Sequence, residues 1–450
     1  MLILFVAAAL AQPPSATPPL FQSNATVSKL PNGLTVVIEE QRRTDVVALH
    51  LRYGVGSRDQ AAGEGGCAHL FEHLMFEGSE HVPTNAFDEW LTSAGGSNNA
   101  WTSYDETAYH MTFPSGALDL ALFLESDRMG FLAPGLTAEN LKNQQDVVLR
   151  ERAEGYSAPH GRDWDALGVL LWPQDHPYHD PIIGTERDIR GFTLDATRNF
   201  HSQHYRASNG VLALVGNVDT AEALGALTRW FGDVPDAGPA TERQRPAPLP
   251  DRAAKGYLED GVEDWSVMMA WPGPERFAED SAAIDLLMYV LSDGRGTRLD
   301  DALYYKGKLA TEVYGFYYPG DLGGPIALYA STPSPRLDMV AAVMEKTVTS
   351  LLTSPPTEAE LARARSRMKS SLLAQLEEPE SRANWLADCQ YYFGTPECLP
   401  RVWERYEAVT SADLSRVAAT WLTPQRAVSL SIVPTGKGGA LAGASLVELP

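Results

Sequence analysis

The chain has 450 residues, of which 44 % are hydrophobic and 21 % are charged. A chain of this length is too long for one hydrophobic core, so the composition predicts a globular protein of two or more domains. The formal net charge of −22 argues against a nucleic-acid-binding protein, because the phosphates would be repelled. We interpret the acidic surface mainly as a means of keeping the protein soluble.

An apolar run, residues 1–11, opens the chain and ends in Ala9-Leu10-Ala11. The run is too short to span a membrane, and no later segment is predicted to do so. Small residues at its end are typical of a secretory cleavage site, although the usual positive charges are missing. We therefore predict a signal peptide at 1–11 and export of the protein; the alternative is a frayed apolar terminus. Residues 12–26 are rich in Pro, Ser and Thr and are predicted to form a flexible leader.

Composition also marks where the domains should divide. Prolines crowd the stretch around residues 236–255, which has little apolar content and is predicted to be a linker. The linker separates a first half, residues 27–235, from a second half, residues 256–435. The Gly- and Ala-rich residues 436–450 are predicted to form a loose tail.

The two halves share a plan of strands followed by helices. In the first half, Asn32-Gly33 between apolar runs predicts a hairpin, residues 46–53 predict a strand, and a helix follows at 65–77. In the second half, a strand at 265–271 precedes a helix at about 280–291. The repeated order predicts an α+β fold made of two homologous α/β halves.

The three cysteines leave two questions open. Cys389 and Cys398 could close a short loop if the protein is exported, but their spacing gives no geometry. Cys67 lies two residues before a histidine and could bind a metal ion. We favour the alternative that it is a small buried residue on the packing face of a helix.

A pair of histidines carries the strongest chemical signal. All ten histidines lie at or before His204, so a histidine metal site must belong to the first half. His69 and His73 are four residues apart and would lie on one face of a helix, with Glu72 beside them. With 10 histidines and 58 acidic residues, chance gives about 0.03 matches to H-x-x-[DE]-H.

The apolar surroundings of this helix favour a bound cation. Burying an unpaired polar group costs about 2–7 kcal/mol, which a metal ion bound by both imidazoles would offset. Imidazole pairs suit zinc, and a catalytic zinc site needs a third protein ligand and an open position for water. Glu72 lies off the line of His69 and His73, so we predict that it acts as the general base. The alternative is a hydrogen-bonded histidine pair with a structural role.

A helix predicted at residues 137–151 offers the third ligand. Gln144, Val148 and Glu151 fall on one face, so Glu151 could reach the metal while Gln144 orients a ligand by hydrogen bonding. Glu154, one turn further, is the rival from spacing alone.

Residues 66–78 and 143–151 resemble a known family. The H-x-x-E-H sequence at His69–His73 is similar to the inverted zinc motif of the inverzincins, the pitrilysin, insulin-degrading-enzyme and mitochondrial-processing-peptidase family. The resemblance implies one Zn²⁺ per chain, with His69, His73 and Glu151 as ligands. Several members have a glutamate where this chain has Gln144.

The resemblance covers most of residues 28–435, including 30–34, 99–102, 176–178, 209–216 and 294–299. It implies half of a peptidase clamshell, in which each half is a mostly antiparallel sheet packed with helices. The first half would be the zinc-binding catalytic domain and the second half a homologous domain without a metal site. The chain resembles the short two-domain bacterial catalytic subunit; together with the predicted export, this resemblance implies a bacterial periplasmic protein.

In this family the segment around Asn99 leads into an edge strand that pairs with the substrate backbone. Asn99 and Ala100 are therefore candidate substrate contacts, and main-chain pairing would suit an extended peptide. The alternation of Thr107, Tyr109, Met111 and Phe113 supports a strand nearby. The alternative is an ordinary sheet edge.

The chain departs from the family pattern at one place. Family members complete the active site with an Arg and a Tyr, seven residues apart, from a second homologous unit, but Tyr304 and Thr311 stand at those positions here. We therefore expect a heterodimer with a homologous subunit that lacks zinc and supplies the Arg/Tyr pair to stabilise the oxyanion.

The sequence thus predicts a zinc metalloendopeptidase that hydrolyses extended peptides or unfolded polypeptides. The alternative is a non-catalytic binding or assembly subunit of peptidase ancestry. A nucleotide-binding oxidoreductase is a weaker option: residues 63–68 match G-x-G-x-x-A, but no parallel βαβ context supports it.

Overall fold

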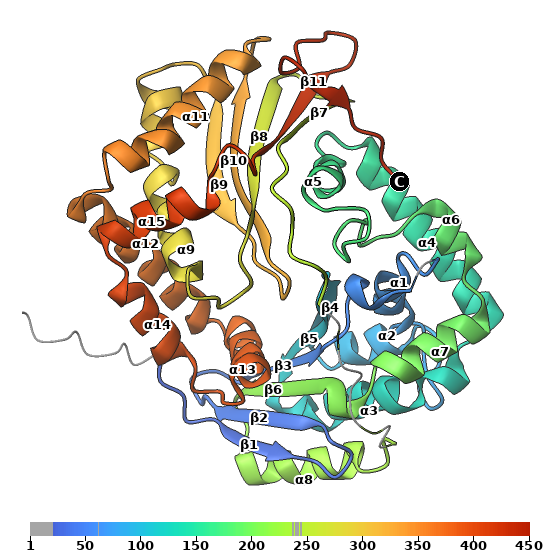
Figure 1. Cartoon of the computed structure of the whole chain (residues 1–450). Coiled ribbons are helices and arrows are strands. Elements are labelled where there is room, and N and C mark those ends of the chain that lie inside the picture. Colours follow the sequence, from blue (N-terminus) through green and yellow to red (C-terminus); the bar gives the residue numbers. More distant parts are fainter. Residues whose placement is uncertain (1–20, 62, 236–237, 239–242, 244) are drawn as a thin grey trace, which may run out of the picture.

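Two six-stranded sheets, one from each half of the chain, form the framework of the molecule (Figure 1). This computed structural model describes residues 21–61, 63–235, 238, 243 and 245–450. The predicted signal peptide, residues 12–20 of the predicted leader and part of the predicted linker lie outside the described residues. Within the described chain, no helix is both long and apolar enough to cross a membrane.

The first sheet has the strand order β1-β2-β6-β3-β5-β4, and β2 and β6 are its one parallel pair. The β1–β2 pair is the hairpin predicted at Asn32-Gly33. Its strands are β1 (Thr26–Lys29), β2 (Thr35–Glu40), β3 (Val46–Tyr53), β4 (Ser97–Thr102), β5 (Thr107–Pro114) and β6 (Gly210–Gly216). The helices packed in the first half are α1 (Cys67–Leu74), α2 (Ala86–Ser93), α3 (Leu118–Gly135), α4 (Ala138–Ser157), α6 (Glu186–Gly191), α7 (Leu194–His204) and α8 (Thr220–Phe231), with short 3-10 helices at Ser57–Asp59, Ser115–Ala117 and Ala207–Asn209.

The second sheet repeats this arrangement with the order β12-β7-β11-β8-β10-β9. Here β7 is parallel to β11, as β2 is to β6, while the next three pairs are antiparallel in both sheets. The strands are β7 (Ala254–Asp260), β8 (Trp265–Gly273), β9 (Glu312–Tyr317), β10 (Gly324–Thr332), β11 (Val428–Pro434) and β12 (Ser445–Leu446). The helices are α9 (Ser281–Leu291), α10 (Arg298–Asp300), a π-helix at Asp301–Tyr305, α11 (Leu337–Thr353), α12 (Glu358–Glu377), α14 (Leu399–Ala408) and α15 (Ser411–Trp421). The predicted α+β fold of two homologous, mostly antiparallel halves is confirmed.

Each half lends one helix to the sheet of the other. Leu167 and Leu171 of α5 (Asp163–Leu171) pack against Met268 of the second sheet, although α5 belongs to the first half of the sequence. Conversely, Leu386 of α13 (Pro379–Phe393) packs against Val211 of the first sheet. Figure 1 shows α5 beside β7 and α13 beside β3 and β6. The exchange ties the two halves together by apolar packing on both sides.

Both sheets are therefore covered on both faces, which explains their composition. In β3, Leu49 and Leu51 face the core of the first half, while Ala48 faces α13. Arg52 shares the face of Ala48, and its guanidinium donates to the Asp388 carboxylate of α13 over 3.0 Å. A strand with buried side chains on both faces reads as a nearly continuous apolar run.

Near both ends the structure shows contacts that the predicted leader and loose tail did not include. In residues 21–26, the described part of the predicted leader, the buried Phe21 packs against Trp403 with 5.4 Å between ring centroids. The predicted loose tail, 436–450, is attached at several points: β12 pairs with β7, and Leu441 and Val447 are buried, although most of its other residues are exposed. In both segments one or two apolar side chains are buried in clusters formed with residues distant in the sequence, which local composition cannot reveal.

The three cysteines form one disulfide, which the sequence left open, and one buried free thiol, which we favoured. Cys389 of α13 and Cys398, just before α14, form a disulfide with their Cα atoms 5.3 Å apart. Cys67 is a free thiol in the core of the first half, as we favoured.

Candidate active site

The chain enters α1 through a turn that only glycine permits. Gly66 has φ +89°, and a Cβ there would lie 2.4 Å from the main-chain oxygen of Ile183. Behind this turn Leu70, Phe71 and Leu74 fill the core of the first half. The remaining face of the helix carries His69 and His73, which are both partly exposed. Helix α1 spans Cys67–Leu74 and is therefore shorter than the predicted 65–77.

Three possible metal ligands converge from two helices. A ring nitrogen of His69, a ring nitrogen of His73 and a carboxylate oxygen of Glu151 lie within 4.8 Å of one another. Nε2 of His69 lies 3.7 Å from Oε1 of Glu151, and Nε2 of His73 lies 3.3 Å from Oε2 of the same carboxylate. Glu154, the rival from spacing, lies one turn further along α4 and is not part of this converging group.

The chemistry of this donor set fits a zinc ion. Two imidazole nitrogens and one carboxylate are the protein ligands of a catalytic zinc site with an open position. Burial lowers the pKa of His69 to about 4, a shift that Glu151 opposes and His73 reinforces. The imidazole is therefore neutral near pH 7, which is the form that binds a metal.

Glu72 lies beside His73 but outside this group. Its Oε2 accepts a hydrogen bond of 2.6 Å from the Thr102 hydroxyl at the end of β4. Burial raises the pKa of Glu72 above its ordinary value, although the hydrogen bond from Thr102 and the nearby His73 act in the opposite direction. The arrangement fixes the carboxylate and increases its affinity for a proton.

The first sheet ends at β4, next to Glu72. Strand β4 pairs with β5 on one side and is the last strand in the order of the first sheet. Asn99 is exposed, Ala100 is half-buried, and the Asn99 side-chain oxygen accepts from the Ala100 N–H over 2.9 Å. Both residues line a hollow of about 560 Å³ with Glu72 and His73. The predicted edge strand is confirmed.

Among the described residues, the Gln144 side chain makes its hydrogen bond to Glu77 and not to His69, His73 or Glu151. Its side-chain amide donates to the carboxylate of Glu77, which also accepts from the Asn140 side chain over 3.3 Å. Gln144 is two turns from Glu151, about 10 Å along the helix, so it cannot reach that side chain. From the sequence we assigned no role to Glu77, the partner of Gln144, or to Thr102, the partner of Glu72. The position of Glu77 just after the apolar run of α1 is a signal that could have indicated its role, whereas Thr102 has no such signal.

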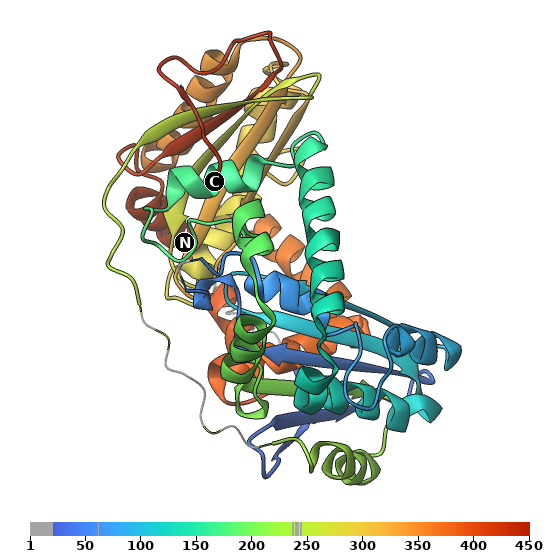
Figure 2. The ribbon, with the colours of Figure 1, turned by 90° about the vertical axis from the view of Figure 1, so that its right-hand side faces the viewer.

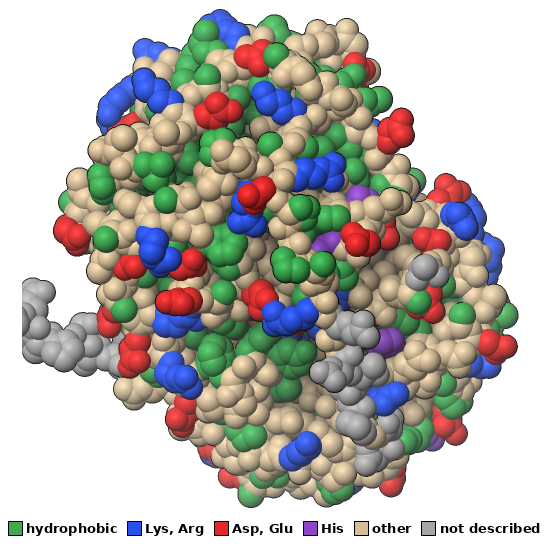
Figure 3. Space-filling model, viewed as in Figure 1, with side chains coloured by type: hydrophobic (Ala, Val, Ile, Leu, Met, Phe, Trp, Pro, Cys, Tyr) green, Lys and Arg blue, Asp and Glu red, His purple; other side chains and the backbone are tan. Residues whose placement is uncertain are grey.

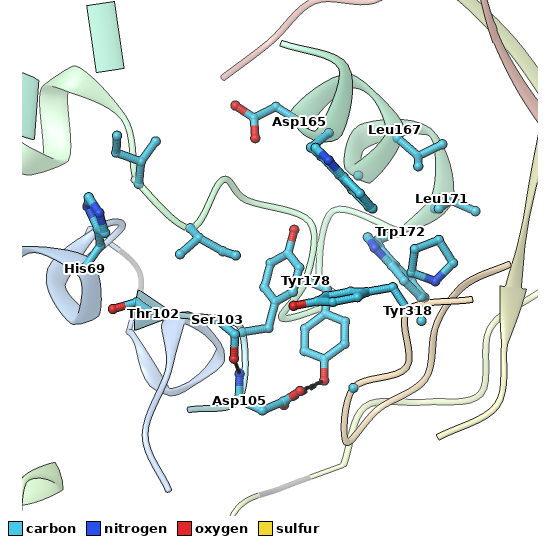
Figure 4. Close-up of a pocket in the computed structure, with 18 of the residues that line it drawn as sticks. His69, Thr102, Ser103, Asp105, Asp165, Leu167, Leu171, Trp172, Tyr178 and Tyr318 are labelled. Carbon is cyan, nitrogen blue, oxygen red and sulfur yellow. Dashed lines mark hydrogen bonds between the residues drawn. The ribbon is translucent and has the colours of Figure 1, made fainter. Parts of the chain in front are cut away.

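An aromatic cavity of about 640 Å³, lined in part by His69, Glu151 and Thr102, lies between the two halves (Figure 4). Both halves contribute to its wall: Tyr104 and Trp164 from the first, Tyr318 from the second. The remaining lining residues include Tyr178, Leu167, Leu171, Trp172, Asp165 and Arg276.

Buried polar contacts hold this wall in place. The Tyr178 hydroxyl donates to the Asp105 carboxylate over 2.6 Å, and the rings of Tyr104 and Tyr178 stack at 4.4 Å. The Asp105 carboxylate also accepts from Arg58 over 3.0 Å. On the face shown in Figure 3, acidic and basic side chains are interspersed rather than gathered into one patch.

The two residues at the positions of the Arg/Tyr pair lie outside these hollows. Tyr304 belongs to the π-helix at Asp301–Tyr305 and is 45 % exposed. The Thr311 hydroxyl donates to Asp264 over 3.0 Å just before β9. Neither residue lines the aromatic cavity or the hollow beside Glu72.

Comparison with known proteins matches both halves to one family. Residues 35–167 match the model described as Insulinase (Peptidase family M16), and residues 191–368 match the model described as Peptidase M16 inactive domain. Zinc protease PqqE of Helicobacter pylori is 28 % identical over 374 residues, covering 80 % of this chain and 82 % of that protein. An uncharacterized zinc protease of Rickettsia bellii is 26 % identical over 398 residues, covering 88 % of this chain and 95 % of that protein.

Solved structures agree with the sequence matches. A protease from Helicobacter pylori superimposes with a TM-score of 0.83 at 25 % identity, covering 92 % of this chain and 100 % of that one. The periplasmic protease PqqL from Escherichia coli shares the fold with a TM-score of 0.77 at 20 % identity, covering 91 % of this chain but 47 % of PqqL. Because both halves match one family, and the Rickettsia bellii protein and the Helicobacter pylori structure align over 95 % and 100 % of their own length, the chain belongs to peptidase family M16.

Proposed function

We propose that the protein is a zinc metalloendopeptidase that hydrolyses extended peptides or unfolded polypeptides, with one Zn²⁺ held by His69, His73 and Glu151. The observation that carries this proposal is the convergence of these three side chains, within 4.8 Å, from two helices that are far apart in the sequence. The zinc protease names of the relatives support it.

When bound, zinc would act as a Lewis acid toward the water and the peptide carbonyl. Glu72 then takes the proton from the attacking water and returns it to the nitrogen of the leaving amine. Two features suit Glu72 to this role: Thr102 fixes one of its oxygens, and burial raises its pKa.

The edge of β4 would bind the substrate as an added strand. A peptide in extended form can pair its backbone with an open sheet edge, which selects for unfolded polypeptides rather than folded ones. Asn99 and Ala100 lie on this edge and share a hollow with Glu72. The incoming backbone would displace the Asn99 side chain from the Ala100 N–H.

The aromatic cavity would receive a bulky apolar side chain of the substrate. It is lined by His69 and Glu151 of the metal group and by Thr102 at the end of β4. Because the rings of Tyr104, Trp164 and Tyr318 line it, filling it would release water from apolar surface.

The active form would be a heterodimer with a homologous subunit that lacks zinc and supplies an Arg/Tyr pair. Tyr304 and Thr311 of this chain offer no such pair, and both lie away from the two hollows. The chain matches 47 % of PqqL, which supports a two-unit arrangement. We also propose that the protein is exported, to a bacterial periplasm, since PqqL is a periplasmic protease.

Metal analysis combined with peptide cleavage tests the proposal. The parent chain, mixed with its homologue, should bind one zinc per chain and cleave an unfolded protein, and a chelator should abolish cleavage. Glu72→Gln should bind zinc and cleave nothing, whereas Glu154→Gln, a matched control on α4, should behave like the parent. Equal cleavage by Glu72→Gln and the parent would contradict the assigned general base.

A non-catalytic binding subunit is the second candidate. The observation in its favour is the missing Arg/Tyr pair at Tyr304 and Thr311. This function predicts that the mixed complex binds unfolded polypeptides but cleaves none, and that Glu72→Gln leaves binding unchanged.

A further inference from the structure

Glu151 lies on a part of α4 that the core of the first half does not hold. The buried side chains of α4 are Leu141, Gln144, Gln145 and Val148, and all of them precede Glu151. Residues 153–155 are exposed. Figure 2 shows α4 extending out of the first half toward the second. The third member of the metal group therefore needs other contacts to fix its position.

Arg152, the next residue, gathers such contacts. Its Nε donates to the main-chain oxygen of Gly184 over 3.0 Å, and its guanidinium donates to the main-chain oxygen of Pro450 over 3.2 Å. The same guanidinium lies 4.1 Å from the ring centre of Tyr156. The Tyr156 hydroxyl in turn donates to Asp165 of α5, the helix that packs on the second sheet.

Pro450 belongs to a terminal strap, residues 445–450, that is anchored on the second sheet. The strap begins as β12, which pairs with β7, and the Val447 N–H donates to the Tyr257 oxygen over 3.0 Å. Val447 is buried, and a Cβ on Gly256 would lie 2.5 Å from its Cγ2 atom. Leu449 packs on the apolar cluster that joins α5 to the second sheet.

A second contact from the same sheet holds the end of α4. Asp260, the last residue of β7, is buried and accepts from the His160 N–H over 2.8 Å and from Arg162 over 3.3 Å. Arg162 also donates to the main-chain oxygen of Glu259 over 2.6 Å. The C-terminal part of α4, through Arg152, and the turn after the helix are thus both hydrogen-bonded to the second half.

We propose that Arg152 is a positioning residue for Glu151, and that the second half sets the place of this zinc ligand through the terminal strap and Asp260. The inference rests on the proposed function, because it requires Glu151 to bind zinc. It gives the second half, which carries no histidine, a direct part in zinc affinity.

For replacement of Arg152 by alanine, the loss of charge and the loss of hydrogen bonds predict opposite changes in zinc affinity, so the measurement distinguishes the two effects. Removing a positive charge beside a zinc site should strengthen zinc binding on Coulombic grounds alone. Losing the contacts of Arg152 should weaken it, since groups that orient a ligand typically contribute about 10- to 100-fold to metal affinity. We expect Arg152→Ala and Arg152→Lys both to lower zinc affinity at least tenfold, because lysine keeps the charge but cannot make both hydrogen bonds.

The experiment uses the full chain and measures zinc affinity by competition with a chromogenic chelator. The visible absorption of the Co²⁺-substituted protein reports the geometry of the site independently of activity. Deleting residues 449–450, which removes the Pro450 contact and leaves β12 intact, should lower zinc affinity and change the Co²⁺ spectrum in the same direction as Arg152→Ala. Arg150→Ala, which removes the charge of an exposed arginine on the same helix, is the matched control, and its zinc affinity should be equal to or higher than that of the parent.

Two outcomes separate this inference from the proposed function. If Glu151→Ala binds zinc as tightly as the parent, the proposed ligand set is wrong. If Glu151→Ala loses zinc while both Arg152 variants and the 449–450 deletion bind like Arg150→Ala, the positioning role is overturned. Thermal unfolding of the metal-free variants serves as a check that each has folded.

Discussion

The hydrogen bond between Thr102 and Glu72 offers a direct probe of the general base. Thr102→Val keeps the size of the side chain and removes the hydroxyl that donates to Glu72 over 2.6 Å. A hydrogen bond to a charged group contributes about 1.5–3 kcal/mol. If that contribution is used to hold Glu72 for proton transfer, kcat/KM should fall about 10- to 150-fold.

The effect should lie in kcat rather than in zinc binding. Thr102 lies on β4, and its hydroxyl bonds Glu72 rather than a member of the metal group, so the zinc content should stay at one per chain. The assay is steady-state cleavage of a fluorogenic peptide by the mixed complex, with kcat and KM determined separately. Thr112→Val, at a surface pair with Ser97 on the neighbouring strand, is the control for the Thr-to-Val change. A Thr102→Val enzyme within twofold of the Thr112→Val enzyme would refute the role assigned to this bond.

Two further predictions concern stability. Glu39 of β2 and Arg382 of α13 form a buried ion pair of 2.8 Å between the first sheet and the helix that the second half contributes to it. Glu39→Ala leaves the arginine buried without its partner and should lower the free energy of unfolding, measured by urea titration, by about 3–5 kcal/mol. A loss below about 1 kcal/mol would mean that this ion pair does not hold α13 on the first sheet. Burial raises the pKa of Asp285 to about 7, against the opposing effects of Tyr406 and Arg405. The folded protein then keeps a proton that the unfolded chain releases near pH 4, so stability falls as the pH rises from 4 to 7 and stays low above. In metal-free protein, Asp285→Asn should gain stability relative to the parent over this range, and a constant difference between the two would contradict the assignment.

Much of the site could be predicted because its signals are local. The i, i+4 spacing of His69 and His73 places them on one helical face whatever surrounds the helix. The alternation from Thr107 to Phe113 likewise indicates β5, and β4 follows as its neighbour. Choosing Glu151 over Glu154 needed the family resemblance, because spacing on one helix does not show which turn faces α1.

What could not be predicted depends on contacts between distant segments. The periodicity of α5 and α13 indicates an apolar face but not which sheet will cover it, so the exchange of helices is invisible in the sequence. The hydrogen bond from Thr102 to Glu72 joins residues 30 positions apart, and the bond from Arg152 to Pro450 joins residues 298 apart. Each forms only after the sheets and helices have taken their places.

Zinc stoichiometry of matched variants tests the central claim most directly. Equilibrium dialysis followed by elemental analysis should give one zinc per chain for the parent and for Glu72→Gln, and none for His73→Ala or Glu151→Ala. This pattern would establish that the three converging side chains bind the metal and that Glu72 does not. Retention of zinc by His73→Ala and Glu151→Ala, or its loss from Glu72→Gln, would contradict the account.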